Sequence, residues 1–147
     1  MAETRQTDAE TAIRARITQY AESVIHAEDP ALAERVWALT PESSFIHPRG
    51  HERGWAEVRD NFYGKTMAGA FSKRDLKLVG EPTIRLYGDS AVVEFEWNFT
   101  AAMKDDGSLL YTRGRESQVY VNTPEAGWKL VHVHYSGPLV TGRGEGF

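Results

Sequence analysis

A change in the period of the apolar residues near Asp75 constrains the fold of this chain more than any other feature. Before Asp75, apolar side chains recur three and four positions apart, as in Ile13, Ile17 and Tyr20. From Asp75 onward they alternate with polar side chains, as in residues 91–104. A period near 3.6 is typical of helices and a period of 2 is typical of strands. The sequence therefore predicts helices first and strands afterwards, which is the order of an α+β fold and not of repeated βαβ units.

The first predicted helix begins at Thr7 and extends to about Glu28. Thr7 and Glu10 have the spacing of a capping box, in which two side chains satisfy free backbone amides at the start of a helix. Tyr20 falls on the apolar stripe of this helix, so its hydroxyl needs a hydrogen-bond partner or a pocket. Residues 1–6 precede the capping signal, and we expect them to be disordered.

Two shorter helices and a short strand are expected before the sheet. Asp29-Pro30 predicts a second helix, because Asp is a favourable N-cap and Pro fits the first helical turn. Thr40-Pro41 ends this helix, and a short strand at 44–47 follows. Gly54 precedes a third short helix. Residues 64–72 are mostly small, and we interpret them as a loop or flap.

Four long strands are expected to form the sheet, at 75–86, 91–104, 109–123 and 127–137. Asp105-Asp106-Gly107 is a strong signal for a hairpin turn between the second and the third. In the second strand the apolar and polar residues occupy opposite faces: Val93, Phe95, Trp97 and Phe99 against Glu94, Glu96 and Asn98. A curved antiparallel or mixed sheet wrapped around the first helix would form a cone with a pocket inside.

The last strand carries large side chains on both faces. Lys129, Val131, Val133 and Tyr135 alternate with a second set that includes His132 and His134. A sheet with one solvated face would show a cleaner separation of apolar and polar residues. We therefore expect the outer face of the sheet to be covered by a second copy of the chain, in a homodimer.

Composition excludes several classes of function. The chain has 147 residues, which predicts one domain over 1–147, and residues 142–147 form a glycine-rich tail expected to be disordered. A net charge of −4 gives no support for nucleic-acid or membrane binding. No cysteine is present, so thiolate chemistry and disulfides are impossible. The polar N-terminus has no signal-peptide pattern, and a cytoplasmic location is expected.

Two motifs carry a resemblance to a known family. Residues 128–137, WKLVHVHYSG, are similar to the last strand of the hub domain of calcium/calmodulin-dependent kinase and its SnoaL-like relatives. Phe45-Ile46-His47-Pro48, followed by Gly54 and later by Phe62-Tyr63, is the second match. From Thr7 onward the chain resembles the nuclear transport factor 2-like superfamily, which includes ketosteroid isomerases. The resemblance implies a cone fold that serves enzymes, carriers and oligomerisation modules.

The same resemblance implies where a pocket lies. The hub domain binds anions through arginines on its sheet, and Tyr135 and residues near Gln118 and Asn98 stand at those positions here. A pocket histidine of the hub domain falls near Val58. Residues expected to line the pocket are Tyr20, Trp55, Val58, Phe62, Tyr63, Asn98, Gln118 and Val133. If Tyr135 points inward, His132 and His134 lie on the outer face.

The pair His132-x-His134 has two interpretations. Alternate residues of a strand project to the same side, about 7 Å apart, so both imidazoles could bind one metal with His47 or His51 as third ligand. No further ligand has a diagnostic spacing, and the alternative is a hydrogen-bonded pair in a dimer interface. We favour the interface and expect neither a metal nor a cofactor.

Two further groups are candidates for proton transfer. Glu96 could be a general base if its face lines the pocket, because burial raises the pKa of a carboxyl. The apolar pattern of its strand favours the other interpretation, in which Glu96 is solvated or at an interface, whereas the resemblance, which places Tyr135 and Asn98 at the pocket, favours the first. His47 could be a general base and Arg49 an anion contact in a loop at the mouth of the cone, although a solvated loop fits equally well. Arg113 and Arg115 are expected to pair with Glu94 or Glu96 across the strands.

Two classes of function remain open from the sequence. The first is a cofactor-independent isomerase, cyclase or hydrolase that binds a small, apolar, oxygenated organic molecule. In that case His47, Glu96, Tyr135 or Tyr20 would transfer protons. The second is a non-catalytic ligand-binding or oligomerisation module like the kinase hub. A closed apolar cavity with one ionisable group of strongly shifted pKa would favour catalysis.

Overall fold

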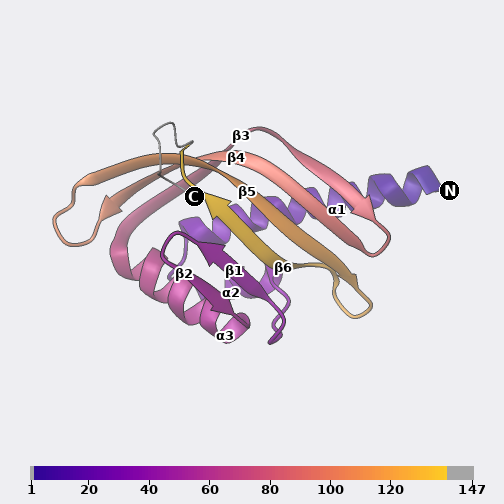
Figure 1. Ribbon diagram of the computed structural model, residues 1–147, viewed down its shortest axis with the longest axis horizontal. Helices are drawn as coiled ribbons and strands as arrows, with labels where there is room; N and C mark the ends of the chain where they lie inside the picture. Colours follow the sequence, from indigo (N-terminus) through magenta and orange to yellow (C-terminus); the bar gives the residue numbers. More distant parts are fainter. Residues whose placement is uncertain (1, 139–147) are drawn as a thin grey trace, which may run out of the picture.

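The computed structural model describes residues 2–138 and has the α+β architecture expected from the sequence (Figure 1). Its elements are, in chain order, α1 (Ala2–Ile25), α2 (Pro30–Val36), β1 (Ser44–His47), β2 (Gly50–Arg53), α3 (Trp55–Glu57), the π-helix η1 (Val58–Ala68), β3 (Phe71–Tyr87), β4 (Ser90–Met103), β5 (Leu109–Thr123) and β6 (Gly127–Ser136). The predicted tail at 142–147 lies outside the described residues.

The strands form one curved, mixed sheet in the order β2-β1-β6-β5-β4-β3. β1 and β6 are parallel, and the other neighbouring strands are antiparallel. Figure 1 shows the long strands curving across α1, which lies along their inner face, while η1 closes one end. The predicted cone with a long N-terminal helix is therefore confirmed.

The start of α1 differs from the prediction. The helix begins at Ala2, and Thr7 lies inside it, where its hydroxyl donates to the Glu3 carbonyl at 2.9 Å. Thr7 is therefore not an N-cap, because a threonine within a helix can bond to the carbonyl four residues earlier. The predicted cap of α2 is confirmed, since Asp29 accepts a hydrogen bond from the Ala31 amide at 3.1 Å.

The predicted loop at 64–72 is largely helical. η1 continues to Ala68, and β3 begins at Phe71, four residues before the expected start at Asp75. The small residues do not break the helix, because the side chains of Arg74 and Lys104 donate hydrogen bonds to its last carbonyls. Arg74 Nη1 donates to the Met67 carbonyl and Lys104 Nζ donates to the Ala68 carbonyl, each at 2.9 Å. Side chains thus satisfy carbonyls that a helix end leaves free.

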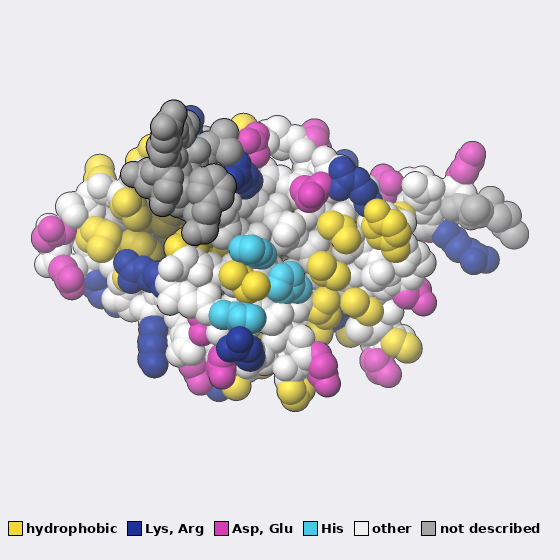
Figure 2. All heavy atoms as spheres, in the orientation of Figure 1, with side chains coloured by type: hydrophobic (Ala, Val, Ile, Leu, Met, Phe, Trp, Pro, Cys, Tyr) yellow, Lys and Arg dark blue, Asp and Glu magenta, His cyan; other side chains and the backbone are white. Residues whose placement is uncertain are grey.

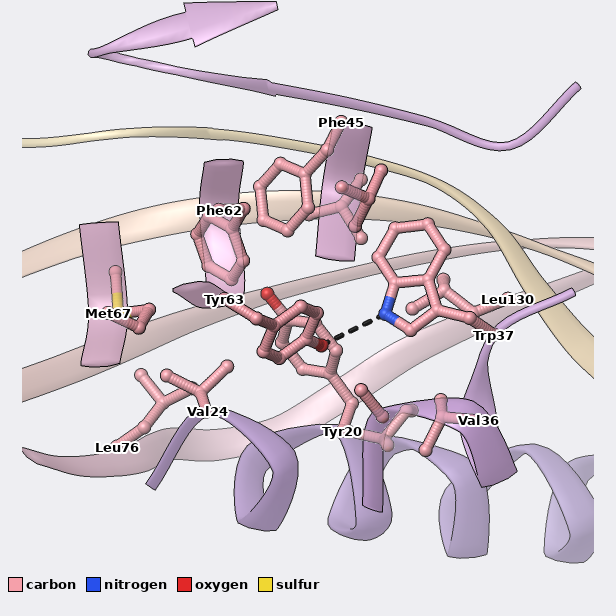
Figure 3. Packing of buried hydrophobic residues seen from close by; sticks show 14 of the residues in the cluster. Tyr20, Val24, Val36, Trp37, Phe45, Phe62, Tyr63, Met67, Leu76 and Leu130 are labelled. Carbon is pink, nitrogen blue, oxygen red and sulfur yellow. Dashed lines mark hydrogen bonds between the residues drawn. The ribbon is translucent and has the colours of Figure 1, made fainter. Parts of the chain in front are cut away.

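The core lies between α1, α2, η1 and the inner face of the sheet. Figure 3 shows Tyr20 rising from α1 beside Tyr63 of η1, with Trp37 and Phe45 packed around them. Trp37 Nε1 donates to the Tyr63 hydroxyl at 2.9 Å, and Ser23 Oγ lies 2.8 Å from the same hydroxyl. These polar groups satisfy one another inside an aromatic core, as buried polar groups must.

A bulge in β6 sets which side chains face inward. Val119 pairs with His132 and Tyr120 pairs with Leu130, so Val131 is the extra residue. An extra residue inverts the alternation that follows it, because side chains change face at every step. Leu130 and Val133 are consequently both fully buried, although strict alternation had assigned them to opposite faces.

Candidate functional site

A cavity of about 200 Å³ lies between α1, η1 and the inner face of the sheet. Its wall is mostly apolar and includes Val24, Phe62, Met67, Phe71, Leu76, Trp97 and Phe99. The polar side chains at its wall are those of Tyr20, Thr66, Thr112, Glu116 and Tyr135, and Arg49 and Leu110 also border it. A site of this composition suits a small, largely apolar molecule with a few polar groups.

Glu116 is the buried carboxyl of this cavity. It sits on β5, directly opposite Phe95 of β4 and Tyr135 of β6, and is 5% exposed. Gln118 Nε2 donates to Glu116 Oε2 at 2.6 Å, and the Tyr120 hydroxyl donates to Gln118 Oε1 at 2.6 Å. Within residues 2–138 no cation forms an ion pair with Glu116.

Burial raises the pKa of Glu116 to about 8, because an ionised carboxylate loses its hydration in the apolar interior. Hydrogen bonds from Gln118 and Tyr20 lower this pKa, but less than burial raises it. The carboxyl is therefore mostly protonated at neutral pH and can both give and take a proton there. A group of this kind is suited to general acid/base catalysis.

Two tyrosine hydroxyls accompany Glu116. Burial, and then the charge of Glu116, raises the pKa of both Tyr20 and Tyr135, so both hydroxyls remain neutral donors. The Tyr135 ring meets the Trp97 ring edge to face, with centroids 5.5 Å apart. Among the described residues, Trp97 Nε1 is the one buried side-chain polar atom without a hydrogen-bond partner.

Behind the cavity, His47 belongs to a separate buried network. His47 Nε2 lies 2.5 Å from Glu52 Oε2, and Asn61 Nδ2 donates to Glu52 Oε1 at 3.0 Å. The Arg49 amide donates to His47 Nδ1 at 3.3 Å. The His47 ring is nearly parallel to that of Tyr135, at 6.3 Å between centroids. Both ring nitrogens are thus engaged by the protein itself.

Comparison with known proteins identifies the family. The family of SnoaL-like domains matches residues 13–140 of the sequence. The chain belongs to this family. None of the functionally curated proteins matches the sequence.

Solved structures agree with this assignment. A nuclear transport factor 2-like superfamily protein from Salmonella enterica serovar Typhimurium LT2 is 51% identical, covers 97% of this chain and 99% of its own, and superposes with a TM-score of 0.93. The structure of LinA is 10% identical, covers 95% of this chain and 92% of its own, and has a TM-score of 0.82. Hexachlorocyclohexane dehydrochlorinase LinA-type3 from Novosphingobium barchaimii LL02 is also 10% identical, with the same coverages and a TM-score of 0.79. The last two share the fold.

In this SnoaL-like protein, only some of the residues expected to line the pocket do line the cavity. Tyr20, Phe62 and Tyr135 line it. The others on the inner side are packed in the surrounding core: Trp55, Val58, Tyr63, Gln118 and Val133. Asn98 does not line the pocket as expected. It lies on the opposite face of β4, because Trp97 and Phe99 on either side of it point inward.

Glu96 likewise lies on the outer face, where it is exposed at an open groove beside Arg115 and His134. The strict alternation of β4 explains this position, since its apolar residues fill the cone. The expected cross-strand ion pairs also differ. Glu94 binds Arg85 of β3, while Arg115 Nε donates to Ser136 Oγ at 3.2 Å.

His132 and His134 occupy the outer face of β6, close to His51 of β2. Figure 2 shows histidine side chains gathered there around an apolar one. Ser44 Oγ lies 2.8 Å from His132 Nδ1, and burial, followed by the charges of His134 and His51, lowers the pKa of His132. Within residues 2–138 no group of three or more potential ligands is arranged to hold a metal ion. The His47 ring lies on the opposite, inner side of the sheet, where it packs against Phe45 and Tyr135.

Glu116 is the candidate site residue that the sequence interpretation missed. It lies between Arg115 and Ser117 in a polar run, where a charged residue usually faces solvent. The available signal was the hairpin register, because the Asp105-Asp106-Gly107 turn places Ala102 opposite Leu109 and hence Phe95 opposite Glu116. Since paired residues share a face, the inward side of Phe95 is also that of Glu116.

Proposed function

We propose that this SnoaL-like chain is a cofactor-independent enzyme that moves a proton on a small, apolar, oxygenated organic molecule. The observation that carries the proposal is Glu116, a buried carboxyl at the wall of an apolar cavity that has no ion-pair partner among residues 2–138. Placing a carboxyl there costs free energy, and groups with strongly shifted pKa values cluster at functional sites. Glu116 replaces Glu96 and His47 as the proposed proton-transfer group.

The arrangement supports abstraction of a proton from carbon next to an oxygen function. Ionised Glu116 takes the proton, and the neutral Tyr20 and Tyr135 hydroxyls can donate to an oxygen on which negative charge develops. Return of the proton elsewhere gives isomerisation, and loss of a leaving group gives elimination. The fold also serves a hexachlorocyclohexane dehydrochlorinase, whose name describes an elimination.

The rival proposal is a non-catalytic ligand-binding or oligomerisation module. A filled cone, or a cavity with neutral polar groups alone, would favour it. The open cavity and the shifted pKa of Glu116 favour the enzyme.

The test is hydrogen exchange in heavy water. The protein is incubated in D₂O with small ketones, aldehydes and carboxylic acids, and loss of carbon-bound hydrogen is followed by proton NMR. We expect exchange of at least one compound by the wild type, at least 100-fold slower exchange by Glu116→Gln, and unchanged exchange by Glu96→Gln. Equal rates for wild type and Glu116→Gln would refute the role of Glu116.

A homodimer through the outer face of the sheet belongs to the same proposal. Half-buried Val92 and Val119 provide apolar surface there. His134, Ser117 and Glu94 stand side by side on three neighbouring strands. A two-fold axis along β5 would place His134 of one copy over the partner's Glu94, in a self-complementary contact.

No helix within residues 2–138 has the length and apolar character needed to cross a membrane. The cytoplasmic location remains part of the proposal and rests on the sequence alone.

A further inference from the structure

We propose that the ligand of the cavity is a small organic acid whose anionic group binds Arg49, and that His47 positions Arg49 for this contact. This inference rests on the proposed function of the cavity and adds the class of its ligand.

The charged residues around the cavity favour a ligand whose anionic group lies at the Arg49 end and not at the Glu116 end. Among the described residues that line it, Arg49 and Glu116 are the charged types. Arg49 is exposed at the mouth, and no carboxylate within residues 2–138 forms an ion pair with it. Glu116 is buried in the apolar wall, and among residues 2–138 no cation forms an ion pair with it, so a second anion beside it would lack a direct cationic partner. A ligand anion is therefore stable at Arg49 and unstable beside Glu116.

A buried network of His47 and Glu52 holds the backbone of Arg49. Pro48 and Arg49 connect β1 to β2, and His47 pairs with Gly50 across that connection. The amide of Arg49 donates to His47 Nδ1 at 3.3 Å, while His47 Nε2 is held by Glu52 at 2.5 Å. The side chains of His47 and Glu52 are 2% and 8% exposed.

The anchor extends to the helix that closes the cavity. Asn61 of η1 donates to the second oxygen of Glu52 at 3.0 Å. A Cβ on Gly50 would lie 2.9 Å from Glu52 Oε2, so the hairpin packs tightly on this carboxylate. A buried polar network is costly unless all its members are satisfied, and this one ends at the backbone of Arg49. We infer that its task is to hold the Arg49 backbone at the mouth.

The size of the cavity limits the rest of the ligand. An apolar cavity of roughly 150 Å³ accommodates benzene, so about 200 Å³ accommodates one ring with a short substituent. The ligand class is thus a carboxylate with a one-ring or short aliphatic body, whose carboxylate lies at Arg49 and whose body extends towards Glu116.

The experiment compares carboxylates with their neutral amides by isothermal titration calorimetry at low salt. The matched probes are phenylacetate with phenylacetamide, and hexanoate with hexanamide. We expect the wild type to bind each acid at least tenfold more tightly than its amide, because an Arg–carboxylate pair is a strong charge-assisted contact. The preference should shrink with added salt, since Arg49 is at the surface.

Two pairs of variants separate the roles of Arg49 and His47. Arg49→Gln should remove the preference for the acid, and Arg49→Lys should keep part of it. His47→Gln keeps a donor for Glu52 but loses the acceptor for the Arg49 amide, so the preference should fall. His47→Asn offers an oxygen near the position of Nδ1 and should retain more of it. Unchanged binding of the amides shows that each variant is folded.

Several outcomes would overturn the proposal. These are equal binding of acid and amide by the wild type, a preference that survives in Arg49→Gln, and no binding of any probe. Equal effects of His47→Gln and His47→Asn would reject the positioning role. Glu116→Gln separates this inference from the proposed catalysis. It should keep the preference for acids even if Glu116 proves to have no part in hydrogen exchange.

Discussion

Glu116 and Tyr135 are direct neighbours across β5 and β6, and both side chains line the same cavity. Residues paired in this way lie about 4.5–5.5 Å apart, within reach of one ligand. The pair therefore presents a carboxyl and a hydroxyl to the same molecule from one rigid sheet. Sites on strands hold their geometry better than sites on loops. The predictions below test this pair and the elements that support it.

The stability of the protein should fall as pH rises from 4.5 to 8, because of Glu116. In this interval the folded protein keeps a proton that the unfolded chain has released, since burial raises the pKa from 4.5 to about 8. The free energy of unfolding then decreases with pH. The contribution is complete below pH 4.5 and is lost above pH 8. It amounts to at most about 5 kcal/mol, at about 1.4 kcal/mol per pKa unit.

Urea denaturation between pH 4 and 9 measures this effect. Glu116→Gln cannot ionise, so its stability relative to the wild type should increase across the interval. Glu96→Gln, on the exposed face of the same sheet, is the matched control and should follow the wild-type profile. Parallel profiles for wild type and Glu116→Gln would show that the carboxyl titrates normally.

The fold could be predicted because it depends on patterns that extend over many residues. The change of period near Asp75, the Asp29-Pro30 cap and the Asp105-Asp106-Gly107 turn all concern local backbone, and they agree with one another. The start of α1 at Ala2 and the helical run to Ala68 could not be predicted, because capping and helix ends depend on tertiary partners. Arg74, which donates to a carbonyl at the end of η1, belongs to β3 and not to the helix itself.

The site was predicted less well because the register of a strand decides which of its side chains point into the cone. One extra residue, Val131, splits β6, so alternation along the whole strand misassigns half of its residues. The resemblance nevertheless implied an inward Tyr135, and Tyr135 does line the cavity. Glu96 and His47 are candidates because of their ionisable side chains, whereas Glu116 becomes a candidate only through its burial in three dimensions.

Replacement of Arg74 should be among the most destabilising changes in the chain. Its guanidinium donates to the carbonyls of Val24, Met67 and Phe71 at 2.8–2.9 Å and also binds Glu28. It thus joins the ends of α1 and η1 to the start of β3. Arg74→Met leaves buried carbonyls without donors and should cost about 3 kcal/mol or more in denaturant titrations. Glu28→Gln, at a side chain that is 65% exposed, should cost less than about 1 kcal/mol. Similar losses for both would mean that the ion pair and not the carbonyl contacts is decisive.

Gly114 should tolerate no side chain, because the Trp97 ring lies over it. A Cβ at this position would collide with the indole and with the Ser136 carbonyl. Gly114→Ala should therefore displace Trp97 from the cavity wall and destabilise the protein by about 1–3 kcal/mol. Gly64→Ala is the control, since its Cβ would make an ordinary contact in η1, and it should be neutral or slightly stabilising. Tryptophan fluorescence and thermal unfolding report the two effects. An unchanged spectrum in Gly114→Ala would contradict the close packing.

Substitutions of Tyr135 and of its neighbour His134 should affect ligand binding and dimerisation respectively, because adjacent residues of a strand point to opposite faces. Tyr135 lines the cavity, and His134 is exposed on the outer face proposed for dimerisation. Tyr135→Phe should weaken phenylacetate binding about threefold to tenfold, by loss of one hydroxyl contact, and should leave the dimer intact. His134→Ala should leave binding unchanged and shift the mass measured by light scattering from a dimer towards 16.5 kDa. A monomeric wild type at micromolar concentration would refute the dimer, whereas weakened binding in His134→Ala with an intact dimer would reverse the assignment of the two faces.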